Sequence, residues 1–142
     1  ARTRWEDVPA NPLTNPRLAP TGKRALCEHR GDVFTVPADA GSWRNLTESS
    51  GVADRYPVWS PDGKQIAWFN DDGGEYGLVI ADQEGNDARR IPIPGNTFYF
   101  TPEWSPDGTR IAFTDTDFRV RVVELASASG VQGLPGPVSV PT

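Results

Sequence analysis

Short runs of apolar and β-branched residues alternate with polar, turn-forming stretches along most of the chain. Between residues 57 and 93 there are four such runs: Val58–Trp59, Gln65–Phe69, Tyr76–Ala81 and Arg89–Ile93. The segments between them are rich in Gly, Pro, Asp and Asn, which favour tight turns. No stretch that is long enough to form a helix has its apolar residues spaced with the period of a helix. The pattern therefore predicts four short antiparallel strands joined by tight turns.

The phrase that contains the first two of these runs occurs twice. Residues 57–69 read PVWSPDGKQIAWF and residues 102–114 read PEWSPDGTRIAFT, so that Trp59 and Trp104 lie 45 positions apart. A weaker third copy, PRLAPTGKRALCE at residues 16–28, places Gly22 41 positions before Gly63. Four strands in a repeat of 41 to 45 residues are typical of a β-propeller blade. Residues 1–125 are therefore predicted to be all-β, forming a partial propeller of about three four-stranded antiparallel blades.

The residues that the two full copies share are expected to form the structural core of the repeat. They are Trp59, Asp62, Gly63, Ile66, Trp104, Asp107, Gly108 and Ile111. Asp-Gly is a strong hairpin signal, because glycine tolerates the positive φ that a tight turn requires. The two repeated tryptophans are predicted to pack between blades, ahead of Trp5, Trp43 and Trp68 as core candidates.

These phrases resemble the repeats of TolB-like and tricorn-type β-propellers. The stretch FTVPADAGSWRNLTESSGVADRYPVWSPDG is more particularly similar to the N-terminal six-bladed propeller of bacterial tricorn-like serine peptidases, and the resemblance runs from about Trp5 to Leu125. It implies a non-catalytic propeller fragment that binds peptides or proteins or gates substrate access, since the catalytic serine of such peptidases lies in C-terminal domains. The first copy departs from the pattern, with Thr21 in place of Asp and Cys27 in place of an aromatic residue.

Two alternatives stay open. One is a free-standing TolB-like protein-interaction module. The other is a small hydrolase, an esterase or a peptidase, in which oligomerisation brings His29 beside a serine or carboxylate of another chain. Within one chain the residues favour no enzyme: Cys27 and His29 share a strand face without an orienting group. Ser60 and Ser105 precede proline in a turn, where a hydroxyl commonly bonds the local backbone.

No metal-binding, cofactor-binding or catalytic residue is predicted. The carboxylates of residues 70–75, NDDGGE, break the spacing of a calcium loop, and residues 115–117, DTD, offer only two carboxylates. Both segments are interpreted as solvated turns. Residues 45–47, NLT, fit a glycosylation acceptor. The single cysteine, Cys27, excludes an intramolecular disulfide and is interpreted as a buried structural thiol.

The formal net charge of −5 argues against partners that need clustered Lys and Arg. Nucleic acid and an anionic membrane surface are such partners, and neither is expected. No apolar run approaches the roughly 18 residues of a membrane span. A soluble protein is expected, and the cytoplasm and the periplasm both remain open as its compartment.

About three blades would be half of a six-bladed ring, which leaves two blade faces and strand edges exposed. A homo-oligomer that closes the ring is therefore expected, most simply a dimer of three-blade chains or one completed by a swapped strand. Residues 126–142 carry no charge and are rich in Gly, Pro, Ser and Val. They are predicted to be a flexible tail or a junction-derived sequence, or else to donate PVSVPT as an edge strand to a neighbour.

Overall fold

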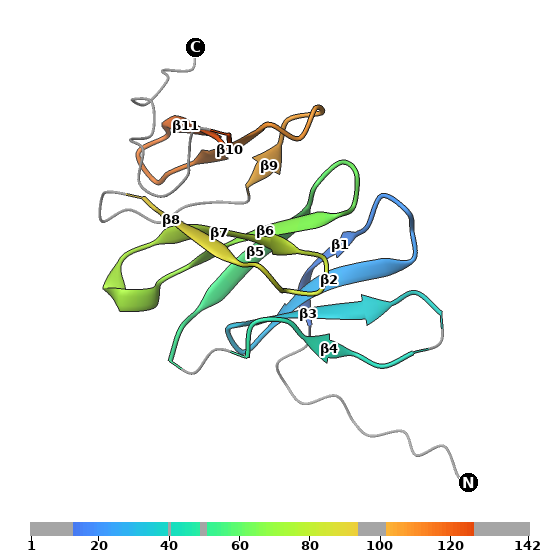
Figure 1. Ribbon diagram of the computed structural model, residues 1–142. Helices are drawn as coiled ribbons and strands as arrows, with labels where there is room; N and C mark the ends of the chain where they lie inside the picture. Colours follow the sequence, from blue (N-terminus) through green and yellow to red (C-terminus); the bar gives the residue numbers. More distant parts are fainter. Residues whose placement is uncertain (1–12, 40, 49–50, 94–101, 127–142) are drawn as a thin grey trace, which may run out of the picture.

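The chain folds into three antiparallel β-sheets stacked one on another (Figure 1). The computed structural model describes residues 13–39, 41–48, 51–93 and 102–126. Within these ranges the only helical element is a 3-10 turn, η1 (Asp72–Gly74), so no described helix has the length and apolar character to cross a bilayer. Trp5 and residues 127–142, for which the sequence made predictions, lie outside the described residues.

Each sheet is a meander in which strands adjacent in the chain are adjacent in the sheet. Blade 1 consists of β1 (Thr14–Leu18), β2 (Arg24–His29), β3 (Asp32–Pro37) and β4 (Arg44–Asn45). Blade 2 consists of β5 (Asp54–Trp59), β6 (Gln65–Asn70), β7 (Gly77–Asp82) and β8 (Arg89–Pro92). Blade 3, as far as it is described, consists of β9 (Glu103–Trp104), β10 (Arg110–Thr114) and β11 (Val120–Glu124). The prediction of an all-β partial propeller is confirmed.

Blade 2 is the centre of the molecule because it buries both faces of its sheet. Side chains alternate across a strand, so even and odd positions of β6 point to opposite sides. Ile66 and Trp68 pack in one cluster with Leu26 and Val33 of blade 1. The intervening residues pack in a second cluster with blade 3, in which the rings of Phe69 and Phe113 meet edge to face, 5.2 Å between centroids. Two apolar seams thus hold three sheets together.

The tryptophans are buried in a different order from the predicted one. Trp104 is buried as expected, but Trp59 is only half-buried. Trp68, which the sequence ranked below both, is 4% exposed, and its indole N–H donates to Oδ1 of the buried Asp54 at 2.8 Å. Trp43 is 60% exposed. The unrepeated Trp68 is therefore the main indole of the seam between blades 1 and 2.

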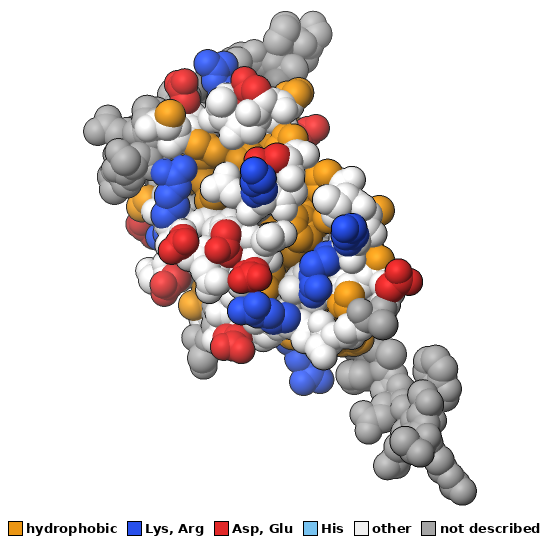
Figure 2. Space-filling view, turned by 45° about the vertical axis from the view of Figure 1, so that its right-hand side comes forward, with side chains coloured by type: hydrophobic (Ala, Val, Ile, Leu, Met, Phe, Trp, Pro, Cys, Tyr) orange, Lys and Arg blue, Asp and Glu red, His pale blue; other side chains and the backbone are white. Residues whose placement is uncertain are grey.

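Charged side chains of both signs are interspersed over the face drawn in Figure 2, with apolar side chains visible between them. This view shows no extended patch of one sign, as the scattered Lys and Arg of the sequence indicated.

Candidate functional site

The turn between the first two strands of blade 2 is held by a compact network of polar contacts. The hydroxyl of Ser60 donates to Oδ1 of Asp62 at 2.6 Å and accepts from the amide of Gln65 at 3.0 Å. The same carboxylate accepts from the amide of Lys64 at 2.9 Å. Gly63 takes a φ of 72°, where a side chain would be strained. Each polar residue of the SPDG phrase thus binds another part of its own turn.

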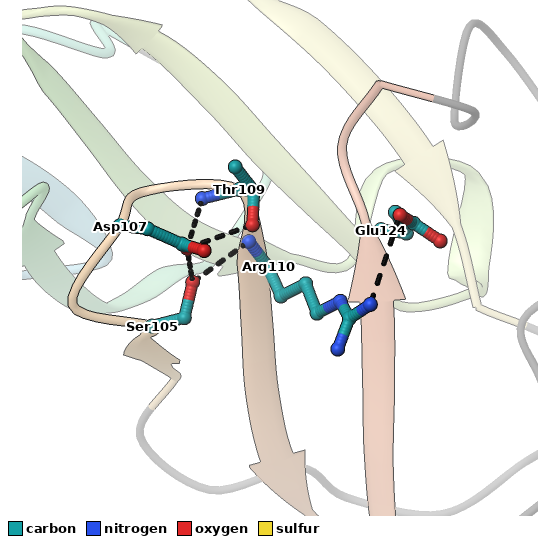
Figure 3. A network of polar contacts seen from close by, with 5 residues as sticks. All are labelled: Ser105, Asp107, Thr109, Arg110 and Glu124. Atoms are coloured by element: carbon teal, nitrogen blue, oxygen red, sulfur yellow. Dashed lines mark hydrogen bonds and ion pairs between the residues drawn. The ribbon is translucent and has the colours of Figure 1, made fainter.

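Blade 3 repeats this network almost without change (Figure 3). The hydroxyl of Ser105 donates to Asp107 at 2.6 Å and accepts from the amide of Arg110 at 3.0 Å, and both the amide and the hydroxyl of Thr109 donate to Asp107. Hydrogen bonds from Ser105 and then from Thr109 lower the pKa of Asp107 to about 2. The pKa of Asp62 is also lowered, first by the Ser60 hydroxyl. These contacts favour the charged carboxylate.

The weaker first copy keeps the backbone of the turn without its side-chain pair. Gly22 has a φ of 72° and donates its amide to the carbonyl of Ala19 at 2.8 Å, as Gly63 does to Ser60. Ala19 and Thr21 stand where the other copies have Ser and Asp. The turn geometry therefore belongs to all three blades, and the Ser–Asp pair reinforces it in two of them.

The first strands of all three blades converge on one cavity of about 570 Å³. Its walls come from the end of β1, from β5 with the SPDG turn that follows it, and from β9. We call it the hub cavity. Its lining includes Arg17, Leu18, Pro20, Trp59, Pro61, Pro102, Glu103 and Trp104.

The hub cavity combines apolar walls with a few polar groups. Two indoles and three prolines form much of its surface, with one arginine and one glutamate beside them. The indole N–H of Trp59 donates to the carbonyl oxygen of Arg17 at 2.9 Å. The buried indole Nε1 of Trp104 has no hydrogen-bond acceptor among the described residues. Aromatic and proline walls with an arginine and a glutamate beside them suit an extended segment that has both apolar and polar side chains.

No family model matches the chain, but solved structures share its fold. It resembles a TolB protein from Agrobacterium tumefaciens at 19% identity with a TM-score of 0.68, covering 82% of this chain and 44% of that one. An oligogalacturonate lyase crystallised with manganese aligns at 16% identity and 0.66, over 82% and 35%. Tricorn protease aligns at 15% identity and 0.61, over 84% and 14%. The chain has the fold of a TolB-like β-propeller. It spans less than half the length of each of these proteins.

At the other end of its first strands, this partial TolB-like propeller has a second cavity of about 410 Å³, lined by residues that include His29, Arg30, Arg55 and Tyr56. The Nδ1 atom of His29 has no hydrogen-bond partner among the described residues, and its ring meets Phe34 edge-on. No hydrogen bond joins His29 to a serine or to Cys27 in the described part of the chain. Burial raises the pKa of the Cys27 thiol. These residues show none of the contacts that activate a nucleophile.

The remaining candidate residues are engaged in local structure. In the segment 70–75, Asn70 accepts from Nε of Arg90 at 2.7 Å, and Asp71 accepts from the amide of Ala53 at 2.7 Å. The side-chain amide of Asn45 donates to Asp32 at 3.0 Å. Across the ranges that the structure describes, no three His, Cys, Asp or Glu side chains gather where they could hold a metal ion.

The interpretation of residues 115–117 as a solvated turn is wrong for Asp115. Its side chain is buried and lies 3.4 Å from Nε of Arg121, while its Oδ1 accepts from the amides of Asp117 and Arg119. No pattern in the sequence indicated this, because Arg121 becomes its partner only through the pairing of β10 with β11. The sequence also did not single out the hub cavity, whose lining residues come from three repeats.

Proposed function

We propose that this TolB-like propeller is a non-catalytic binding module whose hub cavity takes up an extended peptide or a segment of a protein. The observation that supports this best is the convergence of three first strands on a cavity whose walls include two indoles and three prolines. The serine hydroxyls near it support no nucleophilic role, because both donate to the aspartate of their own turn. Binding, rather than bond cleavage, fits these groups.

One setting for such a module is a tricorn-like peptidase, in which the propeller would gate the access of peptides to a distant catalytic domain. The SPDG phrases and the fold shared with tricorn protease favour this setting. A free-standing interaction module of the TolB type is the other setting. A gate would bind many peptides weakly and release them quickly, whereas an interaction module would hold one partner sequence tightly.

The experiment is a binding measurement with two matched tryptophan variants. A library of unstructured peptides is titrated into the full chain, with binding followed by calorimetry. Trp104→Phe keeps an aromatic ring but makes the aromatic wall of the hub cavity smaller. Trp43→Phe makes the same change at an exposed position that does not line this cavity.

We expect Trp104→Phe to weaken the binding of these peptides by roughly three- to tenfold, because the smaller ring makes less aromatic contact with the peptide. Trp43→Phe should leave their affinity unchanged. Failure of every peptide to bind at millimolar concentration, or equal losses in the two variants, would contradict the proposal.

A further inference from the structure

Another cavity, of about 410 Å³, lies between blades 1 and 2 toward their later strands. Blade 1 lines it with Arg24 of β2, Thr35 of β3 and residues 42–44, which lead into β4. Blade 2 lines it with Gln83 and Glu84 of the turn between β7 and β8. We call it the rim groove. It shares no lining residue with the hub cavity, and two adjacent blades are sufficient to form it.

The two walls of the rim groove are fixed to each other. The turn between β7 and β8 lies beside the segment that follows β4 (Figure 1), and a Cβ atom at Gly85 would lie 2.8 Å from the carbonyl oxygen of Leu46. Leu46 packs in turn against the apolar seam between blades 1 and 2. Within the turn, Oδ1 of Asp82 accepts from the amides of Glu84 and Asn86 at 2.9 Å each. The groove is therefore preformed, and a partner that enters it does not have to order its walls.

The guanidinium group of Arg24 is oriented before any ligand is present. Its Nε donates to Oγ1 of Thr35 at 2.7 Å, and Thr35 is 2% exposed. This bond uses one of the five N–H donors of the group. Among the described residues, no carboxylate lies within ion-pair distance of Arg24. Four fixed donors thus remain for an acceptor in the groove.

Trp43 and Arg44 form the exposed part of the rim groove. Trp43 is 60% exposed, and Arg44 is exposed beside it. In the part of the chain that the structure describes, neither side chain has a hydrogen bond or an ion pair, although Glu84 lines the same groove. Two guanidinium groups and one carboxylate make the groove locally positive in a chain whose formal net charge is −5.

The corresponding position in blade 2 is used differently. By strand register, Arg44 corresponds to Arg89, whose Nη2 donates to the carbonyl oxygen of Leu125 in blade 3 at 3.3 Å. Ala88 stands where blade 1 has Trp43. Blade 2 therefore uses its arginine to hold the next blade. Blade 1 instead has an exposed indole beside an arginine that has no acceptor among the described residues, so that the packing of the repeat does not account for this pair.

We propose that the rim groove binds an acidic, extended segment of a partner protein. A carboxylate of the segment would accept paired hydrogen bonds from Arg24 or Arg44, a geometry that suits the guanidinium fork. An apolar or aromatic side chain beside this carboxylate would pack on Trp43. Tryptophan and arginine are enriched among the residues that contribute most to binding between proteins. Because Trp43 leaves the groove open to solvent, the groove suits a segment that continues beyond it better than a small molecule enclosed on most sides.

The test uses a panel of short, fluorescently labelled peptides in which one aromatic residue lies between glutamates, with binding to the full chain followed by anisotropy. Each peptide is paired with a copy that has glutamine in place of glutamate. We expect the glutamine copies to bind at least about tenfold more weakly, because they lose the charged acceptors. The net charge of the chain repels acidic peptides in general, so that a preference for glutamate requires a local positive site.

Arginine variants locate the binding site. Arg44→Gln should weaken the acidic peptides by about five- to tenfold, and Arg44→Lys, which keeps the charge without the fork, should have a smaller effect. Arg119→Gln is the matched control, because Arg119 is equally exposed and does not line the rim groove. Equal losses in Arg44→Gln and Arg119→Gln would indicate general charge attraction and overturn the proposal.

The tryptophan variants separate this groove from the hub cavity. For acidic peptides, Trp43→Ala should weaken binding by roughly tenfold and Trp104→Phe should have no effect, the reverse of the response expected for peptides held in the hub cavity. A loss in Trp104→Phe alone would assign the acidic peptides to the hub cavity and overturn the proposal. Failure of the whole acidic panel to bind at millimolar concentration, or equal binding of the glutamine copies, would also overturn it.

Discussion

Asp62 and Asp107 show how an exposed carboxylate can organise a turn while it remains in water. Each accepts hydrogen bonds from a serine two residues before it and from an amide two residues after it. Such bonds are stronger to the ionised form, so that the protonation of the carboxylate and the geometry of the turn are coupled. The serine directly precedes the turn proline and the aspartate directly follows it. The glycine that comes next takes the positive φ of the turn. This explains why serine, proline, aspartate and glycine recur together.

The carboxyl group of Asp107 should titrate at about 2, well below its ordinary value of 3.8. Because the folded pKa is lowered, the stability that this group contributes is fully present above 3.8 and is lost as the pH falls through about 2. Carboxyl carbon NMR during an acid titration measures this directly. Ser105→Ala removes the largest cause and should raise the pKa of Asp107. Ser60→Ala is the control and should leave it unchanged, and a wild-type pKa at or above 3.8 would refute the assignment.

The tryptophans mark the limit of what the sequence could predict about single side chains. Repetition identified Trp59 and Trp104, but it carries no information about what each copy packs against. Trp68 has Cys27 and Phe113 at the corresponding positions of the other blades, so no repeat signal pointed to it. Its burial depends on Asp54, which accepts its indole N–H from the neighbouring strand β5.

Three strands of blade 2 were predicted well because turn residues bound each of them. The observed β6 ends one residue after the predicted run, and β7 is shifted by one residue at each end. β5 begins at Asp54, four residues before the predicted run. The first strands contain a feature that the sequence did not reveal. Asn15 and Tyr56, at corresponding positions of β1 and β5, have φ values of 50° and 57° where the strand register shifts. Neither is glycine, so the usual signal of such an irregularity was missing.

The turn between β7 and β8 joins two blades as well as two strands. Gly85 has a φ of 82°, and a Cβ atom there would lie 2.8 Å from the carbonyl oxygen of Leu46 in the segment that follows β4. Gly108, in the SPDG turn of blade 3, has a φ of 73° and open space around the same position. Substitution of Gly108 tests backbone strain alone, whereas substitution of Gly85 tests backbone strain together with steric contact between blades.

Gly108→Ala should lower the free energy of unfolding by about 1–2 kcal/mol, the cost of a left-handed conformation for alanine. Gly85→Ala should cost about 1–3 kcal/mol more, because the backbone of blade 1 must move away. Urea denaturation of the two variants beside the parent chain measures both values. Equal losses would show that the contact between Gly85 and Leu46 does not constrain the fold.

Burial is distributed unequally over the three blades. Blade 2 contributes to both apolar clusters, whereas blades 1 and 3 contribute to one each. In a repeat protein, stability is approximately the sum of the repeats and the interfaces between neighbours. The sequence predicted three blades from the recurring phrase. It could not show that equivalent residues differ in exposure, since this depends on whether a neighbouring blade is present.

Amide hydrogens of β6 and β7 should exchange with solvent more slowly than those of β2, β3, β10 and β11, by at least about tenfold. The central strands can open only if both seams separate, whereas a terminal blade needs to break one. Hydrogen exchange followed by mass spectrometry measures this difference. Faster or equal exchange in β6 and β7 would show that the seams do not act as the main stabilising units.

The polar network inside each SPDG turn has an evolutionary consequence. All of its donors and acceptors come from residues 60–65 or 105–110. A duplicated gene segment therefore encodes every residue that its turn needs to form. Ancestors of such chains could therefore gain or lose whole units through recombination, while later substitutions adjusted only the surfaces that meet the neighbours.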